Sequence, residues 1–197
     1  IFHSLSSIKI KDQSEEINLT YIGNVGVAQE LECLIDLASN YKDDLKINII
    51  GDGARLSFLK KISRRKKLNN INFIGKVPLV ALHEYIIKSD ILFAQIGKNF
   101  SSAVPTKIFE YLASSRKILL GLPEGQAKEI FKNFYGIKIF EAGNNEELFK
   151  NFEAIKELKY ESYMAKKNKI VLSTKFIREE NIINYLEFLQ KSFKDHS

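Results

Sequence analysis

Residues 18–51, NLTYIGNVGVAQELECLIDLASNYKDDLKINIIG, decide the fold. Two short apolar runs rich in β-branched residues, 18–23 and 46–51, enclose an amphipathic stretch at 27–41. Neither run alternates strictly between apolar and polar residues, which is typical of a strand buried on both faces of a parallel sheet. A strand, a helix and a second parallel strand make one βαβ unit. The segment therefore predicts the start of an α/β sheet.

The rest of the chain repeats this alternation. Further apolar runs at 71–76, 90–96, 117–123 and 136–142 are separated by helical patterns such as ALHEYIIKSD (81–90) and GQAKEIFKNF (125–134). Right-handed crossovers between parallel strands place helices on both faces of the sheet. We therefore predict an α/β fold: a Rossmann-like, doubly wound sheet of six parallel strands.

The ends of the chain differ from this central part. Residues 1–16 are polar without a clear period and are interpreted as a linker or arm, residues 17–172 as the Rossmann-like domain, and residues 173–197 as a C-terminal helical segment. Residues 144–158 predict a helix capped by Asn144 or Asn145. Residues 176–193 predict a last amphipathic helix. Because the chain begins at Ile1, we expect it to be processed or to be a domain of a longer protein.

Composition restricts the possible partners. The 197 residues are 45% hydrophobic and 27% charged, which is the profile of an ordinary globular chain able to bury a full core. The single cysteine, Cys33, excludes an internal disulfide and fits a reducing cytoplasm. The net charge of +6 suits a partner that carries phosphates, or an anionic membrane surface.

The basic run KKISRRKK (60–67) is the densest charge in the chain. At helical spacing these charges lie on the outer face of a helix whose inner face carries Leu56, Leu59 and Ile62. A solvated surface is the favoured interpretation, with a membrane or nucleic acid as alternatives. Without stacking aromatics nearby, a nucleic-acid partner is not expected.

Glycines gather where the predicted strands end, and ligands of open α/β sheets bind at the carboxyl ends of the strands. The glycines either make turns or bring backbone N–H groups close to a phosphate. The patterns G-x-G-x-x-G and G-x-x-x-x-G-K-[ST] are both absent, so neither an NAD site nor a P-loop NTPase is expected. The three histidines are far apart and no D-x-D occurs, so no metal site is expected.

The stretch AVPTKIFEYLASSRKILL (103–120) starts a helix at the same edge. Pro105 suits its first turn. The residues expected to face the sheet are Ile108, Phe109, Leu112 and Ala113, which leaves Lys107, Glu110 and Ser114 on the other side. Lys107 can then meet a phosphate and Glu110 can accept the hydroxyls of a ribose. Alternatively, the two form an i,i+3 ion pair worth about 0.2–0.5 kcal/mol.

Taken in order, these segments of residues 18–155 resemble a known family: the C-terminal, donor-binding domain of the retaining "group 1" GT-B glycosyltransferases. The stretch PTKIFEYLA (105–113) resembles the P-S-K-x-x-E-Y-x-A motif of their bacterial polysaccharide enzymes. The resemblance implies a metal-independent transferase without a cofactor, which uses a nucleotide-sugar donor between two Rossmann-like domains. The catalytic residues would lie mainly on the N-terminal domain, for which this chain has no room.

The resemblance also implies roles for individual residues. Glu110 would hold the ribose, and Thr106 and Lys107 would lie beside the donor phosphates. The residues expected near the diphosphate are Gly23, Asn24 and Gly26, and those near the base are Gly75, Lys76 and Val77. Ser102 stands where the family has a glutamate that contacts the donor sugar. Asn24 and Gln29 stand in place of an arginine and a lysine, so that Lys107 or Lys98 would supply the positive charge.

The function implied is transfer of a sugar, from a UDP-sugar in the first instance, to a polysaccharide or a lipid-linked acceptor. The chain would be the donor-binding half, partnered by its own N-terminal domain, which the last helix would brace, or by a separate acceptor-binding subunit. We expect it in the cytoplasm, with peripheral contact to the inner face of the membrane. Two alternatives remain: a stand-alone subunit that binds the nucleotide sugar, and a GT-B nucleotide-sugar epimerase.

Overall fold

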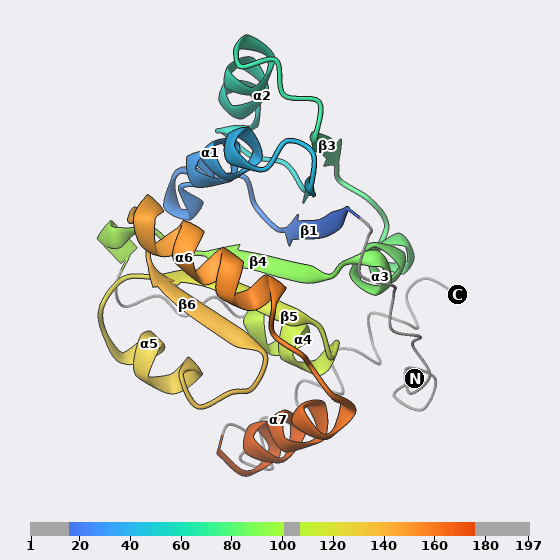
Figure 1. Ribbon diagram of the computed structural model, residues 1–197, viewed down its shortest axis with the longest axis vertical. Coiled ribbons are helices and arrows are strands. Elements are labelled where there is room, and N and C mark those ends of the chain that lie inside the picture. Colours follow the sequence, from blue (N-terminus) through green and yellow to red (C-terminus); the bar gives the residue numbers. More distant parts are fainter. Residues whose placement is uncertain (1–15, 101–106, 176–197) are drawn as a thin grey trace.

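The computed structural model of the chain describes residues 16–100 and 107–175. Its centre is a sheet of six parallel strands in the order β3-β2-β1-β4-β5-β6 (Figure 1). The strands are β1 (Ile17–Ile22), β2 (Leu45–Ile50), β3 (Ile71–Gly75), β4 (Ile91–Gln95), β5 (Lys117–Leu122) and β6 (Ile137–Glu141). Each lies within one residue of its predicted bounds at either end, so the predicted fold class is confirmed.

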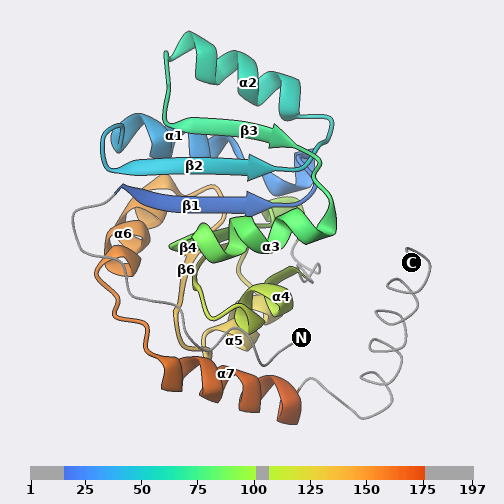
Figure 2. The same ribbon diagram turned by 90° about the vertical axis from the view of Figure 1, so that its right-hand side faces the viewer.

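Helices cover both faces of the sheet (Figures 1 and 2). One face packs against α1 (Glu32–Asn40), α2 (Leu56–Arg65) and α6 (Asn145–Lys156). The other packs against α3 (Leu79–Lys88), α4 (Lys107–Ala113), α5 (Gln126–Phe131) and α7 (Ser162–Lys175). Two short 3-10 turns, η1 (Val27–Gln29) and η2 (Lys98–Phe100), follow β1 and β4. Each face therefore has its own apolar core, as a doubly wound sheet requires.

The direction of winding reverses between β1 and β4. Strand β1 pairs with β2 along six residues, but with β4 along only three, ending at the pair Tyr21 and Phe93. Beyond that pair the carboxyl ends of β1 and β4 are no longer bonded to each other in the ladder. Such a switch point is where open α/β sheets bind their ligands.

Local predictions for the helices hold in part. Asn144 caps α6, because its Oδ1 accepts a hydrogen bond of 3.1 Å from the backbone N–H of Glu147. The predicted helix at 27–41 is divided instead into η1 and α1. Leu59 is buried on the inner face of α2, as predicted for a helix whose basic residues lie on its outer face. None of the described helices is long and apolar enough to cross a membrane.

Helix α7 lies mostly in residues 162–172, for which no element is predicted from the sequence, and it overlaps the predicted C-terminal helical segment only at 173–175. It packs against α4 and places Val171 and Leu172 against the core of that face. The predicted arm at 1–16 and the predicted helix at 176–193 lie outside the described residues, except for Glu16. Pro105, Thr106 and Ser102 lie outside them as well.

Candidate functional site

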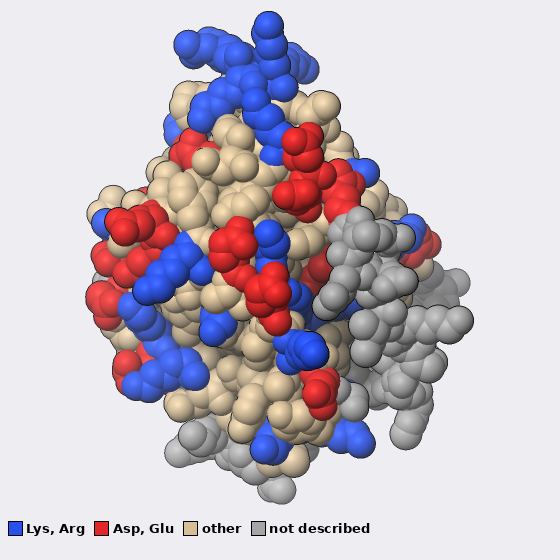
Figure 3. Space-filling model, viewed as in Figure 1, with Lys and Arg blue, Asp and Glu red and all other residues tan. Residues whose placement is uncertain are grey.

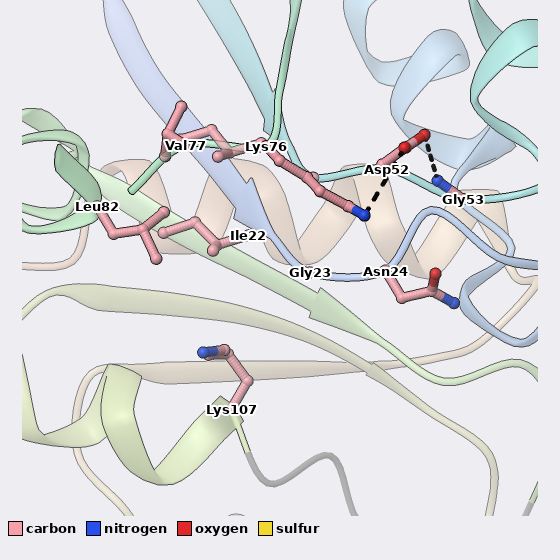
Figure 4. Close-up of a pocket in the computed structure, with 11 residues that line it drawn as sticks. Ile22, Gly23, Asn24, Asp52, Gly53, Lys76, Val77, Leu82 and Lys107 are labelled. Carbon is pink, nitrogen blue, oxygen red and sulfur yellow. Dashed lines mark hydrogen bonds and ion pairs between the residues drawn. The ribbon is translucent and has the colours of Figure 1, made fainter. Parts of the chain in front are cut away.

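A cavity of about 650 Å³ opens at the carboxyl ends of β1, β2 and β3 (Figure 4). We call it the rim cavity. Its lining residues are Ile22, Gly23, Asn24, Ile50, Gly51, Asp52, Gly53, Lys76, Val77, Leu82 and Lys107. They come from three neighbouring strand ends and from the starts of α3 and α4, and the volume is in the range of small-molecule binding sites.

One wall of the rim cavity is made of backbone. The loops after β1 and β2 are joined by hydrogen bonds from Gly23 N to Ile50 O (3.0 Å) and from Val25 N to Asp52 O (2.9 Å). The loop after β2 is joined in turn to the end of β3, since Gly51 N donates to Gly75 O at 2.9 Å. This wall therefore has few degrees of freedom.

Side chains of the neighbouring strands hold the loop after β1 in place by hydrogen bonds to its backbone. The Tyr21 hydroxyl donates to Asn24 O at 2.6 Å. Gln95, at the end of β4, donates to Gln29 O at 3.1 Å and to Glu30 O at 2.8 Å. Burial raises the pKa of the Tyr21 phenol, so the hydroxyl keeps the proton that it donates. The loop is thus positioned from both β1 and β4.

The charges of the rim cavity are two lysines and one aspartate. The Lys76 ammonium lies 4.0 Å from Asp52 Oδ2, and the two groups point toward each other across the end of β2 in Figure 4. Asp52 Oδ1 also accepts the backbone N–H of Gly53 at 2.8 Å. Lys107 extends from the start of α4 on the opposite wall. The lining itself thus has two ammonium groups and one carboxylate, a balance that suits an anionic ligand.

Lys107 and Glu110 form an ion pair on α4. The Lys107 ammonium lies 2.8 Å from Glu110 Oε2 and 3.1 Å from Oε1, and the two side chains are 36% and 46% exposed. The ion-pair alternative is thus present in the structure. Lys107 also lines the rim cavity, whereas Glu110 does not. Both side chains are exposed enough to change partners.

Tyr111 is the main correction to the predicted helix. It is fully buried, although it was not among the residues expected to face the sheet. Its hydroxyl accepts the N–H of Ile22 at 3.1 Å and lies 3.3 Å from Ile22 O, to which it donates. The ring thereby ties α4 to β1 at the point where β1 and β4 separate. Burial raises the pKa of this phenol also.

The structure brings together Gly23, Asn24, Lys76, Val77 and Lys107 at the rim cavity. Gly26 and Gly75 lie in the adjoining backbone of the same loops. Lys98 is placed elsewhere, since its ammonium lies 3.7 Å from Glu141 Oε1 at the end of β6. Ser102 and Thr106 fall outside the described residues.

Six further residues line the rim cavity for which the sequence predicts no ligand role: Ile22, Ile50, Gly51, Asp52, Gly53 and Leu82. For Gly51 to Gly53 a signal existed, because they directly follow an apolar run at the predicted binding edge. Ile22 and Leu82 carry no such signal, as apolar residues there are expected in the core. Among the described residues, no group of three or more His, Cys, Asp and Glu side chains is arranged to hold a metal ion.

Comparison with known proteins assigns the chain to a family. The family described as "Glycosyl transferases group 1" matches residues 5–187, almost the whole chain. The chain belongs to the group 1 glycosyltransferases. No curated protein sequence matches it.

Solved structures of other glycosyltransferases share the fold of this group 1 chain. HepE from Anabaena, solved with UDP and glucose, has a TM-score of 0.69 and 13% identity over 92% of this chain and 49% of its own. The lipopolysaccharide outer core galactosyltransferase WaaB has a TM-score of 0.66 and 15% identity over 85% of this chain and 50% of its own. This group 1 chain thus spans about half the length of both.

A shorter structure is matched almost entirely. The catalytic domain of cholesterol-α-glucosyltransferase from Helicobacter pylori has a TM-score of 0.61 and 15% identity, over 80% of this chain and 99% of its own. At these identities the likeness establishes the fold: this group 1 chain has the C-terminal, Rossmann-like half of a GT-B structure.

Proposed function

We propose that this chain is the donor-binding domain of a glycosyltransferase that uses a UDP-sugar. The observation that supports it most is the rim cavity, which lies beside the switch point of the sheet and has Lys107 on one wall and Lys76 on the other. A nucleoside diphosphate needs cationic and N–H partners for its phosphates and an apolar surface for its base. Val77, Leu82 and Ile22 supply the apolar surface, and HepE, a member of the same fold, was solved with UDP.

Each site residue has a proposed role. The base lies against Gly75, Lys76 and Val77, and the ribose hydroxyls are accepted by Glu110. The diphosphate lies over Gly23, Asn24 and Gly26, with Lys107 as its cation and Thr106 beside it. In binding, Lys107 would turn from Glu110 to a phosphate, and the freed carboxylate would turn to the ribose. Two charge-assisted contacts of about 1.5–3 kcal/mol each would replace a surface pair worth less than about 1 kcal/mol.

The reaction proposed is transfer of the sugar, without a metal, to a polysaccharide or lipid-linked acceptor. Catalytic groups and the acceptor site would come from an N-terminal domain, and the chain alone would be inactive. We place it in the cytoplasm and at the inner face of the membrane, where such acceptors are elongated. Ser102, in place of the family's glutamate, would alter the contact to the donor sugar.

Calorimetric titration with UDP, GDP, ADP and CDP, in the absence of metal, tests the proposal. We expect saturable binding of UDP and a loss of affinity of about tenfold or more in Glu110→Ala. Glu129→Ala is the matched control, because Glu129 forms an i,i+3 ion pair with Lys132 on α5, away from the rim cavity. A folded chain that binds none of the four nucleotides contradicts the donor-site assignment. An equal effect of the two substitutions contradicts the role of Glu110.

A further inference from the structure

The densest run of basic residues in the sequence lies on the second half of α2 and in the two residues that follow it. Figure 3 shows a projection made of blue side chains at the top of the molecule, over α2 of Figure 1. We call it the basic ridge, and its residues are Lys60, Lys61, Arg64, Arg65, Lys66 and Lys67. The chain has 30 Lys and Arg; these six leave 24, which equals the 24 Asp and Glu. The whole formal net charge of +6 is thus concentrated in one short segment.

The basic ridge is not neutralised by its surroundings. In the described part of the chain, only Lys66 has an acidic partner, Asp36, at 2.8 Å. Lys60 and Arg64, and likewise Lys61 and Arg65, are spaced i,i+4 on the helix, where like charges reduce helix stability. The helix dipole favours Arg64 and Arg65 in the last turn, but not Lys60 and Lys61 in the middle. Folding alone therefore does not account for the basic ridge.

A hollow lies directly beneath these cations. A cavity of about 420 Å³ is lined by Lys60, Arg64, Ser63 and Asn72, among others, between α2 and β3. Strand β3 is the edge strand of the sheet, so this hollow lies at the outer margin of the domain. Two cations without acidic partners among the described residues, Lys60 and Arg64, line this hollow and can receive a phosphate. The rest of the lining is Ser63, which is buried, Asn72, whose amide donates to Asn48 Oδ1, and the apolar residues Leu68, Ile71 and Phe73.

We propose that the basic ridge docks the domain onto an anionic lipid surface, with a headgroup phosphate received between Lys60 and Arg64. Four of the six cations lie on α2, and Lys66 and Lys67 directly follow it. Basic clusters on a helix are attracted to anionic bilayers, and each cation near the surface adds to the attraction. The ridge is convex and can contact a flat surface with several side chains at once. The proposal deepens the membrane contact of the proposed function by naming its surface, and it does not depend on the nucleotide.

A nucleic acid fits this surface less well. Single strands are held in grooves where bases stack on aromatic rings. The sequence analysis expects no aromatic residue near the basic run, but the structure exposes Phe58 on α2, 41% accessible. The guanidinium of Arg55 lies 4.1 Å from the centre of this ring and covers one of its faces. One face of this ring is therefore closed to a stacking base. Phe73 also lines the hollow, and the oligonucleotide in the test below distinguishes a nucleic acid from a lipid surface.

Docking through the basic ridge leaves the rim cavity open. Helix α2 follows the loop of Asp52 and Gly53, so its first residues lie beside the rim cavity, and the ridge begins in the middle of the helix. Lys60 lies about 6 Å along the helix from Leu56, and Arg65 lies about 14 Å along it. None of the residues of the basic ridge lines the rim cavity, so a membrane-bound domain can still exchange nucleotide.

The test is sedimentation of the full chain with phosphatidylcholine vesicles that contain about one third phosphatidylglycerol, at low salt. We expect binding that disappears at about 0.5 M salt and that falls about tenfold or more when Lys60, Lys61, Arg64 and Arg65 are all changed to Gln. Changing Lys150, Lys159, Lys166 and Lys169 to Gln is the matched control; these exposed lysines carry the same total charge elsewhere. The control should bind as the wild type does.

Three results would overturn the proposal. They are no binding of the wild type to anionic vesicles, an equal loss in both variants, and binding of an oligonucleotide in place of vesicles. The double variant Lys60→Arg, Lys61→Arg should bind the vesicles as the wild type does. It changes two of the same positions but keeps their charge, so it distinguishes a loss of charge from damage to the helix. A parallel UDP titration of the Gln variant should match the wild type, so failure of the lipid surface and failure of the nucleotide site are read separately.

Discussion

The two walls of the rim cavity are built by different means. The loops after β1 and β2 form a wall of backbone, joined by hydrogen bonds and packed at glycines. The start of α4 contributes the side chain of Lys107, which among the described residues forms its ion pair with Glu110, a residue outside the lining. The first wall is part of the fold, so changes there should cost stability. The second is on the surface, so changes there should affect the ligand alone.

Gly51→Ala should have the largest effect on stability. Gly51 has φ +139°, and a Cβ there would lie 1.8 Å from Gly23 O, in the neighbouring loop. The strained backbone and the overlap with a rigid partner should together lower the free energy of unfolding by about 3 kcal/mol or more. Urea unfolding measures this loss.

Gly75→Ala is the matched control for Gly51→Ala. Gly75 also has a positive φ, +83°, but a Cβ there meets nothing within 4 Å. The substitution should therefore cost only the unfavourable backbone conformation of a non-glycine residue at positive φ, which lowers the free energy of unfolding by about 1–2 kcal/mol. Equal losses in the two variants would show that the loops move apart without cost, and that the backbone wall is not rigid.

Tyr111→Phe should have the next largest effect, because Tyr111 joins the two walls. Its hydroxyl is the partner of the Ile22 N–H where β1 leaves β4. Removing it leaves a buried N–H without that bond, which should lower the free energy of unfolding by about 1–3 kcal/mol. Tyr135→Phe, at an exposed ring, should change it by less than about 0.5 kcal/mol. Thermal unfolding of both variants is the measurement.

The pH dependence of stability in Tyr111→Phe tests whether the buried phenol stays neutral. Burial raises the pKa of the Tyr111 phenol, so the folded chain keeps a proton that an unfolded tyrosine releases near about pH 10. The contribution of Tyr111 to stability is therefore full below that pH and falls as the pH rises above it. The alkaline fall should be smaller in Tyr111→Phe, with part remaining because burial also raises the pKa of Tyr21 and of Cys33. An unchanged alkaline slope would contradict a buried, neutral Tyr111.

The fold could be predicted from sequence because each strand carries its own signal. The runs at 18–23 and 46–51 are apolar, short and bounded by glycine, and the observed β1 and β2 are shifted by only one residue. Helix α7 carries no such signal. Buried Asn168 docks it, through hydrogen bonds of 2.8 Å to both the N–H and the C=O of Tyr135. A contact to the backbone of a distant loop leaves no apolar period in the sequence.

The positions of some residues at the rim cavity could be predicted from the sequence, and those of others could not. Residues that follow a strand, such as Asn24 and Lys76, could be placed because the carboxyl ends of parallel strands share one edge. The role of Tyr111 could not be predicted, because it depends on how far β1 and β4 stay paired. Neither strand's sequence indicates that this pairing stops after three residues. The pairing of Lys107 with Glu110 was foreseen as an alternative, since it needs only helical spacing.

Lys107→Ala and Glu110→Ala should have the smallest effect on stability. Each removes one partner of an exposed i,i+3 pair, so the free energy of unfolding should change by less than about 0.5 kcal/mol. A double-mutant cycle in urea should give a coupling energy of the same size. If the pair belongs to the ligand, either substitution should still weaken UDP binding about tenfold. If the coupling instead exceeds about 1 kcal/mol and UDP binding is unchanged, the pair braces α4, and both walls of the rim cavity belong to the fold alone.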